Sequence, residues 1–409
     1  MKQKHVVIVG GGASGLVAAI YAARNGAKVT LLEQKERVGK KILSTGNGRC
    51  NLTNTHMDAS CFRGDYTDIV EEVLTQFPYT CTVSFFEDLG ILLKDRQGYL
   101  YPNSDQASTV LDVLRMEVEN LKIEVCTEQK VSKIQKKQDC FVVTTSTKTI
   151  HADSVILATG GKAAPVLGSD GSGYTLAKEL GHGIVPVVPA LVQLVGKENF
   201  YKGISGIRLN GQVSLFVDGV PKAQDVGEIQ LTDYGISGIP VFQVSRFASK
   251  GLYEKKTVCA ELDFMPNMSE EELFLFFKKR ISSQGHKTAE EFLIGLFHKK
   301  LNSLLLKLSG ISSKDSADKL TETDVKNLVK TCKHFRTDIV DTKGFEHAQV
   351  CAGGVRTSEV CHQTMESLYV TGLYFAGEVL DIDGICGGYN LQWAWATGAI
   401  AGTSAAKGN

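Results

Sequence analysis

This chain of 409 residues lacks the features that define several large protein classes. No apolar run approaches the length that a helix needs to cross a bilayer, which argues against a membrane protein. Neither sign of charge is in excess, since 45 Lys and Arg residues balance 45 Asp and Glu residues. Because phosphate binding normally leaves a basic footprint, this balance argues against a nucleic-acid partner. The first residues show no signal-peptide pattern, so we expect a soluble, cytoplasmic protein.

Sequence patterns for metal binding and for hydrolysis are missing as well. The ten cysteines have no Cys-x-x-Cys or His/Cys ligand spacing, so we expect reduced and mostly buried thiols. Neither a His-Glu-x-x-His motif nor a Gly-x-Ser-x-Gly nucleophile elbow occurs. Asp381 and Asp383 lie close in sequence, but no histidine or further carboxylate completes a ligand set. We therefore predict no metal site and no hydrolase chemistry.

The most informative motif is a glycine-rich turn after an apolar run at residues 5–9. The turn reads Gly-Gly-Gly-Ala-Ser-Gly at 10–15, a helical pattern follows, and a second apolar run at 28–32 ends on Glu33. This order predicts strand, turn, helix, strand and acid, which is typical of a dinucleotide-binding fold. The alternative interpretation is a turn that binds no dinucleotide and needs glycine only because its backbone has positive φ. Glu33 can accept hydrogen bonds from a ribose, and its charge disfavours the 2′-phosphate of NADP.

The remaining sequence predicts an α/β domain that is split by an insertion. An apolar run at 155–159 adds a buried strand to a parallel, doubly wound sheet. Strand-like alternation dominates from 190 to about 262, helical patterns fill 269–333, and strand character returns from Arg336. We therefore predict a dinucleotide-binding domain at 1–189 and 336–409, an inserted β-barrel-like domain at 190–264 and a helical domain at 265–335.

Two polar segments outside the glycine turn are candidates for cofactor contacts. The loop at 44–54 combines two glycines with the donors Asn47, Arg49 and Asn51. This composition suits a loop that lies against a cofactor ring, although ordinary turns favour the same residue types. Glu378 follows a buried strand, where an acid can hold a sugar or ribityl hydroxyl; a solvated loop acid is the alternative.

A third candidate is the segment 384–390, which leads into the last helix. The N-terminus of that helix can stabilise negative charge that develops on the pyrimidine part of a flavin. Cys386 lies in this segment and Cys50 in the earlier loop. Neither thiol has a Cys-x-x-Cys partner, so we interpret both as packing residues.

Together these segments resemble a known family. The matching stretches are the 10–15 turn with Glu33 and the segments 39–54, 168–174, 231–238, 353–355 and 375–392. On these stretches the chain resembles the bacterial YhiN/BaiN-like flavoproteins, also called the aminoacetone-oxidase-like FAD-binding family, over essentially its whole length. It departs from the family pattern at Cys351, where the family has Thr, and at Asp233, where the family often has His. The second departure puts a substrate role for that position in doubt.

The resemblance implies a Rossmann-like FAD-binding domain of the glutathione-reductase and fumarate-reductase type, with an inserted β-barrel-like domain and a small helical domain. It also implies which segments hold FAD: the glycine turn, the 39–51 loop, the strand end at 377–378 and the start of the last helix. The predicted FAD-binding residues are Gly10, Gly12, Ala13, Ser14, Gly15, Glu33, Gln34, Lys41, Gly46, Asn47, Gly48, Arg49, Cys50, Asn51, Thr159, Gly160, Gly377, Glu378, Gly388, Tyr389, Asn390 and Leu391.

We expect an FAD-dependent oxidoreductase whose small organic substrate lies between the flavin domain and the insertion. Because the family that the chain resembles is linked to such a reaction, the main hypothesis is reduction of a conjugated C=C bond, as in a bile-acid or steroid enone, with NADH or NADPH as a transient donor. The alternatives are oxygen-dependent oxidation of an amine such as aminoacetone, and a flavin-binding redox sensor without turnover. We expect Arg49 to orient substrate or stabilise reduced flavin, and Asn390 to mark the helix start near the pyrimidine edge. Tyr234 and Asp233 are the candidate acid or base groups.

Overall fold

The apolar run at residues 5–9 forms the central strand of a five-stranded parallel sheet in the computed structural model, which describes residues 3–407. The strand order is β20-β11-β1-β2-β7, and each neighbouring pair is parallel. Both faces of such a sheet are buried, which explains the uninterrupted apolar runs. This arrangement confirms the predicted α/β fold with a Rossmann-like sheet. The strands are β1 (His5–Val9), β2 (Lys28–Leu32), β7 (Glu124–Cys126), β11 (Ser154–Leu157) and β20 (Leu373–Phe375).

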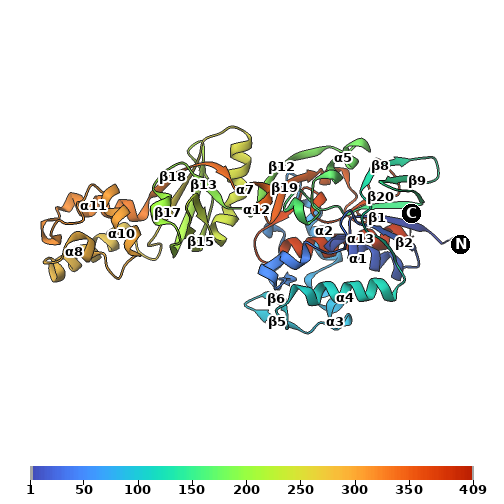
Figure 1. Cartoon of the computed structure of the whole chain (residues 1–409), viewed down its shortest axis with the longest axis horizontal. Coiled ribbons are helices and arrows are strands. Elements are labelled where there is room, and N and C mark those ends of the chain that lie inside the picture. Colours follow the sequence, from blue (N-terminus) through green and yellow to red (C-terminus); the bar gives the residue numbers. More distant parts are fainter. Residues whose placement is uncertain (1–2, 408–409) are drawn as a thin grey trace. The chain divides into compact units, whose positions relative to one another are not determined.

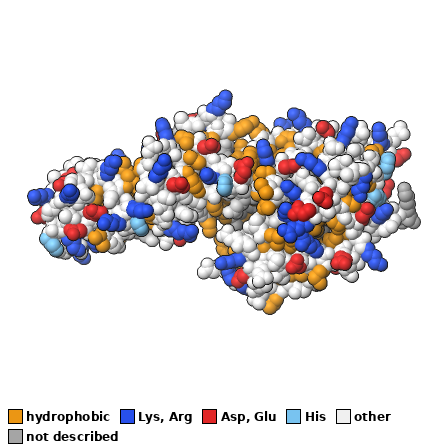
Figure 2. Space-filling view, viewed as in Figure 1, with side chains coloured by type: hydrophobic (Ala, Val, Ile, Leu, Met, Phe, Trp, Pro, Cys, Tyr) orange, Lys and Arg blue, Asp and Glu red, His pale blue; other side chains and the backbone are white. Residues whose placement is uncertain are grey.

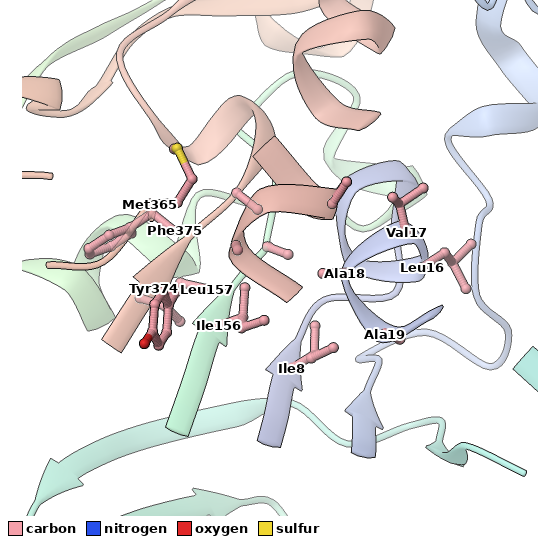
Figure 3. Close-up of a cluster of buried hydrophobic side chains, with 14 of the residues drawn as sticks. Ile8, Leu16, Val17, Ala18, Ala19, Ile156, Leu157, Met365, Tyr374 and Phe375 are labelled. Carbon is pink, nitrogen blue, oxygen red and sulfur yellow. The ribbon is translucent and has the colours of Figure 1, made fainter. Parts of the chain in front are cut away.

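Two helices from opposite ends of the sequence pack together against this sheet (Figure 1). A Cβ atom at Gly398 would lie 2.5 Å from the Ser14 carbonyl oxygen, and one at Gly402 would lie 2.3 Å from that of Ala18. Glycine therefore lets the two helix backbones touch. Figure 3 shows the adjoining core, in which Ile8 and Ile156 of the sheet lie near helix residues such as Ala18. The helices are α1 (Ala13–Arg24) and α13 (Tyr389–Lys407).

The sheet belongs to the first of two units in the described chain. This unit contains the residues up to Val188 and those from Gln349 onward, so both ends of the chain contribute to it. Its other elements are η1 (Ile42–Gly48), β3 (Thr53–Asn54), η2 (Ala59–Cys61), β4 (Phe62–Arg63), α2 (Asp68–Gln76), α3 (Tyr79–Asp88), β5 (Leu93–Arg96), β6 (Tyr99–Pro102), α4 (Ala107–Asn120), β8 (Val131–Lys136), β9 (Phe141–Thr145), β10 (Thr149–Ala152), η3 (Pro165–Leu167), α5 (Ser172–Glu179), β12 (Ile184–Ala190), β19 (Val350–Val355), η5 (Thr357–Glu359), η6 (Gly377–Val379) and β21 (Asp383–Gly384).

The second unit, Pro189–Ala348, contains a closed six-stranded barrel in the order β13-β16-β15-β14-β17-β18. Inward and outward side chains alternate along β14, as the wall of a filled barrel requires. The helices α8 and α11 begin with capping boxes at Ser269 and Thr321. The elements are β13 (Leu194–Gly196), α6 (Tyr201–Ile204), β14 (Arg208–Val217), β15 (Val220–Leu231), β16 (Gly235–Ser237), α7 (Ile239–Tyr253), β17 (Val258–Asp263), α8 (Glu270–Gln284), α9 (Ala289–Phe292), α10 (Lys299–Leu308), η4 (Ala317–Lys319), α11 (Glu322–Lys333), β18 (Phe335–Thr342) and α12 (Gly344–His347).

The structure differs from the prediction at one domain boundary, the one predicted at residue 336. Residues from 336 were predicted to return to the dinucleotide-binding domain, but β18 pairs with β17 and β13 and closes the barrel. The chain therefore re-enters the first unit at Gln349. A buried strand pattern in the sequence does not reveal which sheet the strand joins. The barrel and the helices also share one hydrophobic core, so they form a single unit rather than two.

Charged side chains of both signs are interspersed over the face shown in Figure 2. This distribution agrees with the balanced composition. Among residues 3–407, no helix combines the length and the apolar character needed to span a bilayer.

Candidate functional site

The glycine turn between β1 and α1 is fixed by close backbone contacts. Gly10 has φ +106°, and a Cβ atom there would lie 2.4 Å from the Ala158 carbonyl oxygen. A Cβ atom at Gly15 would lie 1.8 Å from the Gly10 carbonyl oxygen. Since no L side chain tolerates such contacts, glycine is required at both positions to bring α1 against the sheet.

Gly12 has a different role in the same turn. A Cβ atom there would have no heavy atom within 4 Å, so the space beside it is open. Gly12 is also the N-cap of α1, yet no side chain caps the helix and no acidic residue lies in its first turn. The positive end of a helix dipole beside open space suits a phosphate group.

Glu33 is held beside this turn by two backbone groups. The Gly11 N–H donates to Oε2 at 2.8 Å, and the Lys35 N–H donates to Oε1 at 2.8 Å. Burial raises the pKa of the Glu33 carboxyl above its ordinary value, while these hydrogen bonds oppose the shift. Its neighbour Gln34 donates to the Gly168 carbonyl oxygen. The end of β2 therefore carries a fixed acceptor next to the open space at Gly12.

The predicted ring-facing loop has an unusual backbone. Gly46, Asn47, Gly48 and Cys50 all have φ between +55° and +83°. The intervening Arg49 is exposed, whereas Cys50 is fully buried. Burial raises the pKa of the Cys50 thiol to about 12, so this thiol stays protonated at neutral pH.

Two predicted cofactor contacts carry buried oxygen atoms without a hydrogen-bond partner among residues 3–407. They are Asn51 Oδ1 and Thr159 Oγ1. A buried polar atom without a partner costs about 1–3 kcal/mol, which a bound ligand can recover. With the open space at Gly12 and the acceptor Glu33, these atoms fit a bound dinucleotide such as FAD.

Glu378 and Lys41 meet although 337 positions separate them. Lys41 Nζ lies 2.8 Å from Glu378 Oε2, and the Cys351 N–H donates to Glu378 Oε1 at 2.9 Å. The carboxylate therefore joins the 39–51 loop to strand β19. In the structure Glu378 is an ion-paired side chain rather than a solvated loop acid.

The start of α13 is built from residues of the Gly-Gly-Tyr-Asn-Leu-Gln segment. Asn390 accepts a hydrogen bond from the Gly384 N–H and donates one to the Gly384 carbonyl oxygen, both at 2.8 Å. A Cβ atom at Gly388 would lie 2.8 Å from the Thr53 carbonyl carbon. The helix start is thus fixed against β3, the strand that follows the predicted ring-facing loop.

Gln392 is a residue of this segment that the sequence analysis did not single out. Its side chain is fully buried; Oε1 accepts from Thr53 Oγ1 and Thr82 Oγ1, both at 2.7 Å, and Nε2 donates to the Phe77 carbonyl oxygen at 3.0 Å. The sequence signal that could have revealed Gln392 is a glutamine within an otherwise apolar helical pattern.

The two candidate acid or base residues lie in the second unit, whereas every predicted FAD-binding residue lies in the first. Asp233 and Tyr234 form the turn between β15 and β16, where Asp233 is exposed. Lys343 Nζ lies 4.6 Å from the centre of the Tyr234 ring. Burial raises the pKa of the Tyr234 hydroxyl above its ordinary value. Among residues 3–407, no group of His, Cys, Asp and Glu has the arrangement of a metal site.

Comparison with protein families gives one decisive match. The model of the HI0933-like protein Rossmann domain matches residues 4–404. The chain belongs to the HI0933-like family. The match covers both parts of the first unit and the whole insertion between them.

Two curated relatives align with this HI0933-like chain over nearly its whole length. The "3-dehydro-bile acid delta(4,6)-reductase" of Clostridium scindens is 50% identical over 407 residues, covering 99% of this chain and 100% of the relative. The "Ribosomal RNA dihydrouridine synthase" of Haemophilus influenzae is 31% identical over 398 residues, covering 96% of each chain.

A solved structure shows the same fold at low sequence identity. The Mycobacterium smegmatis Sdh1 complex in the apo form has a TM-score of 0.50 and 16% identity, with 100% of this chain and 69% of the other covered. Family membership and the full-length likeness to a reductase identify this HI0933-like chain as an FAD-dependent oxidoreductase.

Proposed function

We propose that the enzyme reduces a C=C bond conjugated to a ketone in a steroid-like acid, with NADH or NADPH as the electron donor. The observation that carries this proposal is the 50% identity, over the full length of both chains, with a protein named as a bile-acid reductase. Bound FAD supplies two-electron transfer. Nicotinamide binding is transient in this proposal, because the sequence has a single glycine-rich dinucleotide turn.

In this proposal the residues of the first unit bind and orient the cofactor. The turn at 10–15 holds the pyrophosphate and Glu33 accepts hydrogen bonds from the ribose. The exposed Arg49 orients the substrate or stabilises negative charge on the reduced ring. Asn390 is a positioning residue, since both ends of its amide already bind Gly384.

A second candidate function is reduction of a pyrimidine in RNA. The 31% identical relative named as a ribosomal RNA dihydrouridine synthase favours it. The two reactions are chemically close, because the double bond lost on forming dihydrouridine is also conjugated to a carbonyl group. The balanced net charge favours the small-molecule substrate, since RNA binding normally requires a basic surface.

Anaerobic mixing of the purified enzyme with single reactants distinguishes these functions. We expect NADH or NADPH to bleach the flavin absorbance, and a 3-oxo-4,6-diene bile acid to restore it. Restoration by a uridine-containing ribosomal RNA fragment, but not by the bile acid, would favour the second candidate. Bleaching by an amine alone would indicate an oxidase, and a flavin that no donor bleaches would indicate a sensor.

A further inference from the structure

A thiol, an ammonium group and a carboxylate meet at the edge strand β7 of the first unit. Lys148 Nζ lies 3.0 Å from Cys126 Sγ. The Cys126 thiol can donate to Glu124 Oε1, which lies 3.6 Å from the sulfur, and Lys148 Nζ lies 3.9 Å from the same oxygen. None of the three side chains has a part in the proposed reduction. Lys148 comes from the turn before β10, so the contact joins two separate sheets.

This arrangement places a cationic nitrogen and a carboxylate oxygen close to the Cys126 sulfur. The ammonium group is the nearer of the two charges, at 3.0 Å from the sulfur against 3.6 Å for the carboxylate oxygen. The hydrogen bond with Cys126 raises the pKa of Lys148 above its ordinary value. Glu124 is oriented by a hydrogen bond from Thr30 Oγ1 at 2.9 Å, which lowers the pKa of its carboxyl group.

The cluster is accessible to small molecules. The side chain of Lys148 is 38% exposed and that of Glu124 is 55% exposed, while Cys126 is partly buried. Thiols beside a cation and partly open to solvent are the ones that oxidants attack first. The Cys126 carbonyl oxygen accepts a hydrogen bond from the Glu33 N–H at 2.9 Å, so the cluster adjoins the strand that carries the ribose-binding acid.

We propose that Cys126 and Lys148 are an oxidation-sensitive pair that closes to a sulfur–nitrogen bond in the presence of hydrogen peroxide. The thiolate attacks one peroxide oxygen and the O–O bond breaks; the hydroxide that leaves takes a proton from the Lys148 ammonium group, so that a sulfenic acid, water and a neutral amine form. The Lys148 amine, after losing its proton, attacks the oxidised sulfur and expels the second water. In sum, one thiol, one amine and one peroxide give one S–N bond and two waters. The sulfur loses two electrons and the peroxide gains them.

The test is peroxide treatment of the FAD-loaded full-length protein. Free thiols are then alkylated, and the digest is analysed by mass spectrometry without reductant. We expect a linked pair of peptides containing Cys126 and Lys148, lighter by two hydrogen atoms and separated again by a thiol reductant. We also expect Cys126 to be consumed several-fold faster than Cys140, the surface thiol whose partner is His151 at 3.8 Å, because only Cys126 lies beside a lysine.

Two substitutions separate the charge of Lys148 from its nucleophilic nitrogen. In Lys148→Arg the thiolate keeps a cation, so fast oxidation persists, but the sulfenic acid accumulates and dimedone traps it. In Lys148→Met oxidation slows several-fold, because the cation beside the sulfur is lost, and no linked peptide forms. The proposal is overturned if Cys126 reacts no faster than Cys140. It is also overturned if Lys148→Met oxidises at the wild-type rate, or if wild type gives dimedone adducts without linked peptides.

Discussion

Gly12 and Gly15 lie in the same turn, but different interactions require glycine at the two positions. At Gly15 a side chain would enter the space of the Gly10 carbonyl group, so the polypeptide fold itself excludes it. At Gly12 the backbone is extended, with φ −82°, and the space is open, so the fold tolerates a side chain. In our proposal that open space belongs to the pyrophosphate.

Substitution at these glycines therefore has opposite consequences. We expect Gly12→Val to fold with the unfolding midpoint of the FAD-free wild type but to lose FAD affinity at least about tenfold, because the methyl groups occupy the phosphate position. Gly15→Ala serves as the contrast and should lower stability by about 2 kcal/mol or more. Flavin absorbance of the purified proteins and urea unfolding measure the two effects. Unchanged flavin content in Gly12→Val would remove this glycine from the phosphate site.

At the scale of elements, α13 is fixed by polar contacts as well as by apolar packing. Gln392 is the only described residue that joins α13, the strand β3 and the helix α3 through side-chain hydrogen bonds to Thr53 and Thr82. These contacts fix the position of the start of α13 and of the segment 384–390 that leads into it. A buried polar group of this kind stabilises the fold only while every partner is satisfied.

Replacing Gln392 by Met should lower the free energy of unfolding by about 2–5 kcal/mol. The volume is nearly kept, but two hydroxyls and the Phe77 carbonyl oxygen lose their partner in a buried site. Urea unfolding followed by circular dichroism measures the change, and Gln138→Met at an exposed position is the matched control. Equal stability of both variants would contradict this account.

In the second unit, a pH-sensitive contact joins the barrel to its helices. His334 lies 2.9 Å from Glu261 of β17 and 2.8 Å from Glu270 of α8. These hydrogen bonds raise the pKa of His334 above its ordinary value of 6.5. Because the folded pKa is raised, the stabilisation is complete below that ordinary value and is lost as pH rises through the folded pKa.

Thermal unfolding should show this dependence as the pH rises above 6.5. We expect the unfolding midpoint of the wild type to fall more steeply across this range than that of His334→Gln, which has no titrating ring. His286→Gln, at an exposed position, should keep the wild-type slope. Parallel slopes for wild type and His334→Gln would show that the contact has no effect on stability.

At the scale of the whole molecule, the insertion leaves and re-enters the first unit through adjoining strands. β12 and β19 pair with each other; the Arg356 N–H donates to the Gly183 carbonyl oxygen, and Gly353 packs against Pro186. These contacts match an antiparallel pair, so the two ends of the insertion lie next to each other. The first unit also has a hydrophobic core of its own.

Replacement of residues 189–348 by a short Gly/Ser linker should therefore leave a folded protein that still binds FAD. The linker only has to close a narrow gap between paired strands, at a small entropic cost. Flavin absorbance and a cooperative thermal transition are the measurements. A variant that unfolds cooperatively yet binds no FAD would show that the second unit supplies part of the cofactor site.

The strand, turn, helix and acid at 5–33 could be predicted from the sequence, because apolar periodicity and glycine content act locally. The sequence also revealed the family through motifs spread along the chain. Only the tertiary structure decided which sheet β18 joins, that Glu378 pairs with Lys41, and that Gln392 fixes α13. Each of these depends on contacts between residues far apart in the chain, and local residue preferences carry no information about such contacts.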